Sequence, residues 1–173
     1  FTISTGTMYD KVFTLLTLSA GGLEGYAEGV MDPIPDFLEE TISGTMAFLG
    51  DTILPSVVGR SFENPQALDA LFANPWRGNR MALATVEMAL WDLWAKWLDL
   101  PLATALGGVR EAIDVGVSLG IGPIDGTLDR IAAHVAQGYK RIKLKIMPGH
   151  DLALVAAARA AFPAVKLSVD ANS

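Results

Sequence analysis

Cationic and apolar side chains alternate one for one in the segment RIKLKI, residues 141–146. A strand with this pattern places Arg141, Lys143 and Lys145 on one side, because successive strand residues face opposite sides. The later segment KLSVD ends in the carboxylate of Asp170. Two amines and a carboxylate on neighbouring strands could form a plain ion pair on a solvated face. They could also line the polar interior of a barrel, at the mouth where barrel enzymes carry out their chemistry.

The chain from residue 110 onward supplies the elements that must position these groups. A period of two, typical of strands, is present in AIDVGVSLG, RIKLKI and KLSVD, with strand starts near residues 113, 141 and 166. Helical spacing is present in TLDRIAAHVAQG and LALVAAARAAF, the first closed by Gly138 and the second capped by Asp151. This spacing predicts parallel strands with right-handed crossovers. The helix-facing residues are apolar, whereas the other face carries polar residues toward the strand ends: Ser118, Lys143, Lys145, Ser168 and Asp170.

The segment before residue 110 predicts a separate domain of mixed α and β structure. A hairpin is indicated by KVFTLLTLSA and LEGYAEGV on either side of Gly21-Gly22. Helices are predicted after caps at Asp36, running through residues 37–39, and at Asn64. The strongest helical pattern covers residues 79–100, and its three tryptophans are expected on buried faces: Trp91, Trp94 and Trp97. The domain boundary is placed near Val109, after Gly107-Gly108.

Composition excludes several classes of protein. The chain has 173 residues, a net charge of -6 and no cysteine. The acidic balance argues against a nucleic-acid partner, and no apolar run reaches the length of a membrane span. The absence of cysteine excludes disulfides and thiolate metal sites and favours a reducing, cytoplasmic compartment. The oligomeric state is left open, a homo-oligomer included. Both ends look cut, so we expect a portion of a longer protein.

Several segments resemble the enolase superfamily and, within it, the muconate-lactonizing subgroup. The branch resembled most contains o-succinylbenzoate synthases and N-acylamino acid racemases. The resemblance rests on GYKRIKLKI, DLALVAAARAAFP and LSVDANS, on the helix in ATVEMALWDLWAKWLDLPLATALGG, on GGLEGYAEG, and on FTISTGT, which is similar to a mobile capping-domain loop near the substrate. It implies an α+β capping domain over residues 1–109, lacking its first strand. A modified TIM barrel then follows, an α/β barrel of which residues 110–173 form the first three strands.

The resemblance also implies a role for each polar residue of the predicted barrel strands. Lys145 corresponds to the acid/base lysine at the end of the second barrel strand, and Lys143 to its neighbour, which contacts the substrate carboxylate. Asp170 corresponds to the first of three carboxylate ligands of Mg²⁺, with Mn²⁺ as an alternative. Asn172 corresponds to a polar residue beside the metal site that faces the substrate, and Ser118 is expected to face the substrate as well.

These residue types suit the removal of a proton α to a carboxylate, which produces an unstable dianionic enediolate. A hard divalent cation on oxygen ligands stabilises the developing charge, and a neutral amine takes the proton. An ammonium next door and a nearby cation both favour the neutral form of Lys145. The expected partner is therefore a small carboxylate substrate. The first choice is dehydration to o-succinylbenzoate in menaquinone biosynthesis, and N-acylamino acid racemisation or cycloisomerisation uses the same residues.

Two other classes of protein stay open. The family pattern requires further acidic ligands and an opposing lysine on later strands, so the 173 residues alone are expected to be inactive. A non-catalytic half-barrel scaffold is one alternative. A dinucleotide-binding domain is the other, because GIGPIDG lies between a strand and a helix. That loop departs from G-x-G-x-x-G, and Pro123 removes an amide donor that a phosphate would need.

Overall fold

The chain forms two compact units in a computed structural model that describes residues 1–72 and 76–172. One unit, called here the hairpin–helix unit, contains residues 12–109. The other, called here the sheet unit, contains residues 1–11 and the chain from residue 110 on. The division at residue 109 coincides with the predicted boundary, but the first eleven residues lie with the sheet unit instead of with residues 12–109. The amide of Ile121 donates a hydrogen bond to the carbonyl of Thr2 at 2.9 Å, which ties the N-terminal segment there.

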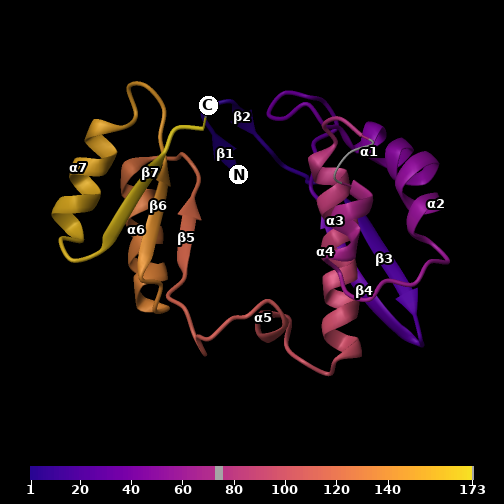
Figure 1. The fold of residues 1–173 in the computed structure, drawn as a ribbon. Coiled ribbons are helices and arrows are strands. Elements are labelled where there is room, and N and C mark those ends of the chain that lie inside the picture. Colours follow the sequence, from indigo (N-terminus) through magenta and orange to yellow (C-terminus); the bar gives the residue numbers. More distant parts are fainter. Residues whose placement is uncertain (73–75, 173) are drawn as a thin grey trace. The chain divides into compact units, whose positions relative to one another are not determined.

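The hairpin–helix unit is built on the predicted hairpin (Figure 1). Strands β3 (Thr14–Ala20) and β4 (Leu23–Gly29) are antiparallel. Gly21 and Gly22 connect them with φ of 59° and 80°, the left-handed conformation that tight hairpin turns require at both central positions. The hairpin packs on helix α4 (Arg80–Trp97). Contact is closest at Gly25, where an added Cβ would lie 2.2 Å from the carbonyl oxygen of Ala89.

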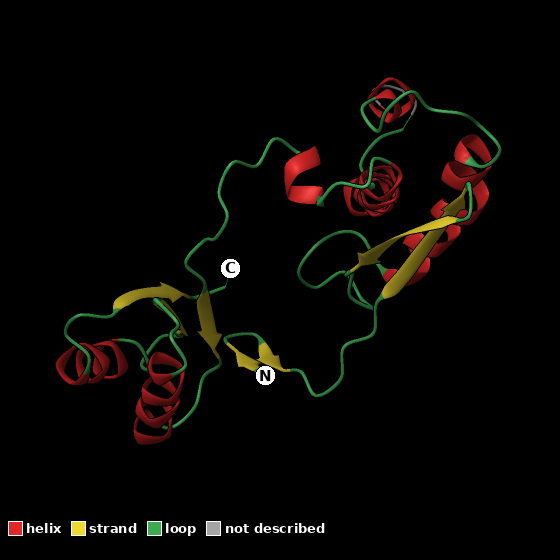
Figure 2. Ribbon diagram, turned by 90° about the horizontal axis from the view of Figure 1, so that it is seen from below, coloured by secondary structure: helices red, strands yellow, loops and turns green. Residues whose placement is uncertain are grey.

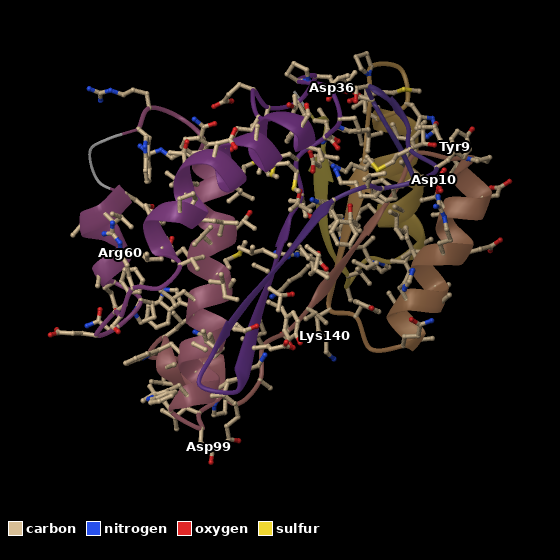
Figure 3. All side chains as sticks on the ribbon, turned by 90° about the vertical axis from the view of Figure 1, so that its right-hand side faces the viewer. Tyr9, Asp10, Asp36, Arg60, Asp99 and Lys140 are labelled. Atoms are coloured by element: carbon tan, nitrogen blue, oxygen red, sulfur yellow. The ribbon has the colours of Figure 1, made fainter. Side chains whose placement is uncertain are left out.

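Helix α4 confirms the strongest helical pattern of the sequence. Four of the five residues of the predicted apolar stripe are buried, namely Ala82, Val86, Ala89 and Leu93, and the fifth, Trp97, is not. The expectation that all three tryptophans are buried is wrong for Trp97, which is 63% exposed. Trp97 occupies the last turn of α4, where its ring lies beside the turn at Gly21. The chain then leaves the helix through Asp99, whose φ is 53° and whose side chain points away from the helix end (Figure 3).

Short helices complete the core of the hairpin–helix unit. They are α1 (Ile42–Phe48), the π-helical turn η1 (Leu49–Ile53), α2 (Leu54–Val57) and α3 (Ala67–Phe72). Helix α5 (Leu102–Ala105) follows α4 and buries none of its residues. Leu49, Ile53 and Leu68 are buried against α4 in one apolar cluster, to which Leu16 and Leu18 of β3 contribute. Asn64 caps α3 as predicted, since its side-chain oxygen accepts from the amide of Ala67 at 3.1 Å.

The predicted helix after Asp36 is wrong. Residues 37–39 form bends, and the helix begins at Ile42 with Thr41 as its cap, whose hydroxyl accepts from the amide of Gly44 at 3.2 Å. Neighbouring Glu40 is buried because its carboxylate caps a different helix. It accepts from the amides of Met81 and Ala82 at 2.8 and 3.0 Å at the start of α4. A negative charge there is favourable, because the first amides of a helix lack partners within it.

An ion pair within α4 forms hydrogen bonds to the backbone of the hairpin. The Asp92 carboxylate accepts from the Lys96 ammonium at 2.7 Å and from the backbone amide of Tyr26 at 2.9 Å. The Lys96 ammonium also donates to the carbonyl of Glu24 at 2.7 Å and lies 4.7 Å from the centre of the Tyr26 ring. The Lys96 hydrogen bond, helped by the Tyr26 amide, holds the pKa of Asp92 below its ordinary value against partial burial, which raises it.

The sheet unit contains three parallel strands in the order β5 (Gly116–Leu119), β6 (Arg141–Lys145) and β7 (Lys166–Asp170). Helix α6 (Ile124–Ala136) connects the first two strands, and α7 (Leu152–Ala161) connects the second two. Figure 2 shows both helices on one face of this sheet. Ile142 and Leu144 point to that face and are buried with Leu119, Ile131 and Leu154. The predicted caps hold, since Asp151 accepts from the amide of Leu152, and Gly138 follows α6 with φ of 94°.

The strand pattern is confirmed, with one change of boundary. Strand β5 begins at Gly116, not near residue 113, because Gly116 is opposite Arg141, where β6 itself begins. Just before β5, the carbonyl of Val115 accepts a hydrogen bond from the amide of Lys140 at 3.1 Å. The described residues form an open three-stranded sheet, so the closed barrel stays a prediction.

The sheet unit also contains a two-stranded ribbon at the start of the chain. Strands β1 (Thr2–Ile3) and β2 (Gly6–Thr7) pair as a short antiparallel hairpin. Throughout the part of the chain that is described, none of the helices has both the length and the apolar character needed to cross a lipid bilayer.

We expect Gly25→Ala to lower the free energy of unfolding by roughly 3 kcal/mol, because the new methyl group would overlap a backbone oxygen of α4 that cannot move aside. Gly50→Ala is the matched control, since an added Cβ at Gly50 meets no atom within 4 Å. The control should change the free energy by less than about 1 kcal/mol. Urea unfolding measures both variants, and equal effects would contradict the close approach at Gly25.

Asp92→Asn should reduce the acid sensitivity of folding. A carboxyl group whose pKa is lower in the folded than in the unfolded state stabilises the fold above the unfolded pKa. This stabilisation is lost as the pH falls from about 4, just above the ordinary value of 3.8, toward the lower folded pKa. Unfolding midpoints measured between neutral pH and this acid range should therefore decline less steeply in Asp92→Asn than in the wild type. Lys96→Met should show the same flattening because it removes the main cause of the shift, and an unchanged slope would refute the assignment.

Candidate active site

The parallel register brings the predicted site residues to one end of the sheet. Lys143 is opposite Ser118 of β5 and Ser168 of β7, and Lys145 is opposite Asp170. Because Ile142 and Leu144 face the helices, both lysines belong to the other face of the sheet. The period of two in RIKLKI therefore separates the core from the site, as predicted.

The two amines and the carboxylate converge. The Nζ atoms of Lys145 and Lys143 lie 2.8 and 3.0 Å from the same oxygen, Oδ2 of Asp170. Lys145 is only 8% exposed, whereas the side chain of Lys143 is 41% exposed. Lys145 is thus the interior member of the triad, and Lys143 is the one that solvent or a ligand can reach.

Asn172, in the segment after β7, contacts both Lys145 and Asp170. Its side-chain oxygen accepts a hydrogen bond from Lys145 Nζ at 2.7 Å, and its backbone amide donates to Asp170 Oδ1 at 3.0 Å. The backbone of Asn172 has a φ of 50°. This left-handed conformation is uncommon outside glycine, and asparagine is one of the residues that tolerate it.

These contacts fix the charge of Asp170. The hydrogen bond from Lys145 is the main cause that holds the pKa of Asp170 well below its ordinary value, and the Asn172 amide and Lys143 add to it. Asp170 is therefore a carboxylate at neutral pH. With one anion shared by two cationic side chains, the site can attract a negatively charged ligand.

Ser118 lies beside this group with a hydroxyl that no described residue binds. Its Oγ is buried and has no hydrogen-bond partner among the described residues. Burying a hydroxyl without a partner costs free energy, so such groups in native proteins usually serve a ligand or an ordered water. The observation is compatible with the predicted contact between Ser118 and the substrate.

Loop contacts at this end of the sheet were missed from the sequence. The Ser4 hydroxyl of the N-terminal hairpin donates to the carbonyl of Ala171, between Asp170 and Asn172. His150 Nε2 lies 3.0 Å from the carbonyl of Gly122. These contacts join residues far apart in the sequence and leave no local spacing signal.

The glycine-rich loop after β5 is held as a turn by contacts to its carbonyl groups. Arg130 donates to the carbonyl of Gly120 at 3.1 Å, and Pro123 occupies the cap of α6 without an amide proton. An anion-binding loop needs free amides that point at the phosphate, so this geometry does not favour the dinucleotide-binding alternative.

The donor atoms fit one position of a metal site, not a complete one. Asp170 supplies a carboxylate oxygen, a hard ligand of the kind that Mg²⁺ binds, whereas the amide oxygen of Asn172 accepts from Lys145 Nζ. No group of three or more acidic, histidine or cysteine side chains able to hold a metal occurs within residues 1–72 and 76–172. The other ligands of a complete site would have to come from elsewhere.

Comparison with known proteins identifies the family. Residues 1–107 match the family described as "Mandelate racemase / muconate lactonizing enzyme, N-terminal domain". The chain belongs to this family. The predicted resemblance to the muconate-lactonizing subgroup of the enolase superfamily is thereby confirmed, and with it the capping domain at the N-terminus.

Relatives within the family match along the whole chain. The chain is 49% identical to an N-succinylamino acid racemase of Thermus thermophilus and 40% identical to an o-succinylbenzoate synthase of Bacillus subtilis. Both alignments cover 100% of this chain and 47% of the relative. A crystal structure of an enolase superfamily member from Listeria innocua is 38% identical, with a TM-score of 0.87 over 96% of this chain and 46% of that one. The chain thus spans about half the length of the relatives, which are enzymes.

Asp170→Ala should lower the melting temperature of the protein by about twice as much as Lys143→Ala, or more. Removing Asp170 leaves the ammonium of Lys145 buried without its charged partner, which is strongly destabilising, whereas removing Lys143 leaves the inner pair intact. Thermal unfolding at neutral pH measures the difference. Equal effects would mean that Lys145 does not depend on Asp170 for its charge compensation.

Proposed function

We propose that Lys145 is the acid/base group of an enzyme that removes a proton α to a carboxylate. The observation that carries the proposal is the convergence of Lys145, Lys143 and Asp170 at one end of a parallel sheet, in a chain of the mandelate racemase / muconate lactonizing enzyme family. The activity belongs to a protein of the relatives' full length, because the described residues supply only part of the expected site.

The proposed step is a single proton transfer. In its unprotonated form, the amine of Lys145 takes the α-proton and forms a new N–H bond, while the electron pair of the broken C–H bond moves into the substrate carboxylate to form an enediolate. Lys145 thereby becomes the ammonium that pairs with Asp170. The low exposure of Lys145 favours this use, since a base shielded from water keeps its orientation toward the substrate. Lys143, exposed beside it, would bind the substrate carboxylate, and the partnerless hydroxyl of Ser118 would donate to the same molecule.

We propose Mg²⁺ as the cofactor, with Mn²⁺ as an alternative, and Asp170 as one of its ligands. A bound divalent cation supplies electrostatic stabilisation of the negative charge that develops on the enediolate. Asp170 is suited to this role because it is ionised at neutral pH. Ligation by Asp170 can be tested by metal titration of the full-length protein, in which Asp170→Ala should weaken Mg²⁺ binding.

The proposed overall reaction is dehydration to o-succinylbenzoate. The 40% identity to the Bacillus subtilis synthase supports it, together with 43% identity to the synthase of Geobacillus kaustophilus. Racemisation of an N-succinylamino acid is the second candidate, favoured by the 49% identity to the Thermus thermophilus racemase. Both begin with the same proton transfer. Assaying the full-length protein with each substrate in turn distinguishes them.

The test of the proton transfer is exchange of the substrate α-proton for deuterium in D₂O with Mg²⁺. Lys145→Ala in the full-length protein should lower the exchange rate by about 10³-fold, the size of a general-base contribution. Lys166→Ala is the matched control: Lys166 begins the neighbouring strand, at the opposite end from Asp170, and is exposed, so exchange should stay at the wild-type rate. Retention of wild-type exchange by Lys145→Ala would show that the base is another group. A full-length wild type with no exchange on any tested carboxylate would favour the non-catalytic scaffold.

A further inference from the structure

We propose that Asn172 is a positioning residue that orients the amine of Lys145, an inference that rests on the proposed function of Lys145 as the base. The resemblance to the enolase superfamily implies contact between Asn172 and the substrate. The structure instead shows the side-chain oxygen of Asn172 in a hydrogen bond with Lys145 Nζ at 2.7 Å, slightly shorter than the contact between Lys145 and Asp170.

Two acceptors determine how the Lys145 amine can turn. A tetrahedral nitrogen has three positions besides its bond to Cε, and hydrogen bonds to Asp170 Oδ2 and Asn172 Oδ1 occupy two of them. In the neutral amine these two positions hold the two hydrogens, so the lone pair occupies the third. With only one acceptor the amine could rotate about its Cε–Nζ bond, and the lone pair would no longer have a defined direction. A proton transfer depends steeply on that direction.

Of the two acceptors, the side-chain oxygen of Asn172 is the one that is not shared with Lys143. Asp170 Oδ2 is shared between Lys145 and Lys143, at 2.8 and 3.0 Å. By contrast, the only hydrogen bond observed for Asn172 Oδ1 within the described residues comes from Lys145. Because an amide oxygen carries no net charge, its hydrogen bond does not depend on how the charge of Asp170 is shared among neighbouring cations.

The backbone of Asn172 makes this arrangement possible. The left-handed φ of 50° allows the amide N–H to bond Asp170 Oδ1 while the side chain turns back to Lys145. Asn172 therefore forms hydrogen bonds with both members of the Lys145–Asp170 ion pair. Asparagine combines tolerance of this conformation with a side-chain acceptor, whereas glycine offers only the conformation.

The two roles for Asn172 predict different kinetics in the full-length protein. Asn172→Gly keeps the left-handed backbone and the amide N–H but removes the acceptor oxygen. If Asn172 positions the base, kcat should fall about tenfold or more while KM stays within about twofold. Asn172→Asp restores an acceptor oxygen and should recover part of the lost kcat. Asn79→Gly is the matched control, because Asn79 is also left-handed, with φ of 53°, and makes no side-chain cap to α4; its kcat should stay at the wild-type value.

A crystal structure of Asn172→Gly gives a readout independent of activity. We expect Lys145 Nζ to remain near Asp170 but to lose its single defined position. Three results would overturn the proposal: a raised KM with unchanged kcat, which would make Asn172 a substrate-binding residue; unchanged kinetics; or a Lys145 amine equally ordered in the same position. Wild-type proton exchange in Lys145→Ala would instead overturn the proposed function itself, so the two failures are distinguishable.

Discussion

A buried ammonium group must be paired, and the site is organised around this requirement. Lys145 is almost fully enclosed, and an unpaired charge in that position would cost several kcal/mol. The parallel register places Asp170 opposite Lys145 on the next strand, so the partner is supplied by the sheet itself. The same register leaves Lys143 one repeat nearer the strand start, where it reaches the same carboxylate oxygen from a more exposed position. One anion thereby holds two amines with different access to solvent.

Hydrogen bonds between charged side chains and distant backbone groups also stabilise the hairpin–helix unit. Glu40 satisfies the first amides of α4, and Asp92 fixes the hairpin to the same helix through Lys96 and the amide of Tyr26. Gly25 allows the hairpin backbone to approach α4 closely enough for these contacts to form. Polar groups in both units therefore act as specific ties between elements that apolar packing brings together.

Local patterns predicted the elements whose structure depends on local physics. The alternation in RIKLKI predicted both the strand and the face on which each lysine lies, because the period of two is a property of the extended backbone. The hairpin turn at Gly21-Gly22 followed from a conformation that glycine adopts readily. The errors occurred where a distant partner decided the outcome. Asp36 had a good capping residue type, but Thr41 caps the helix, and the start of β5 was set by where β6 begins.

The sequence by itself determined which residue types are present, which of them share a face of a strand, and which family they resemble. Only the tertiary structure decided that Asn172 turns back to Lys145, that Ser4 reaches Ala171, and that the Ser118 hydroxyl is buried without a partner among the described residues. The physical reason is the distance in sequence between the residues that interact. Strand periodicity is dictated by neighbouring residues, whereas the 2.8 Å between Lys145 and Asp170 exists only because pairing of β6 with β7 brings together residues separated by a whole helix.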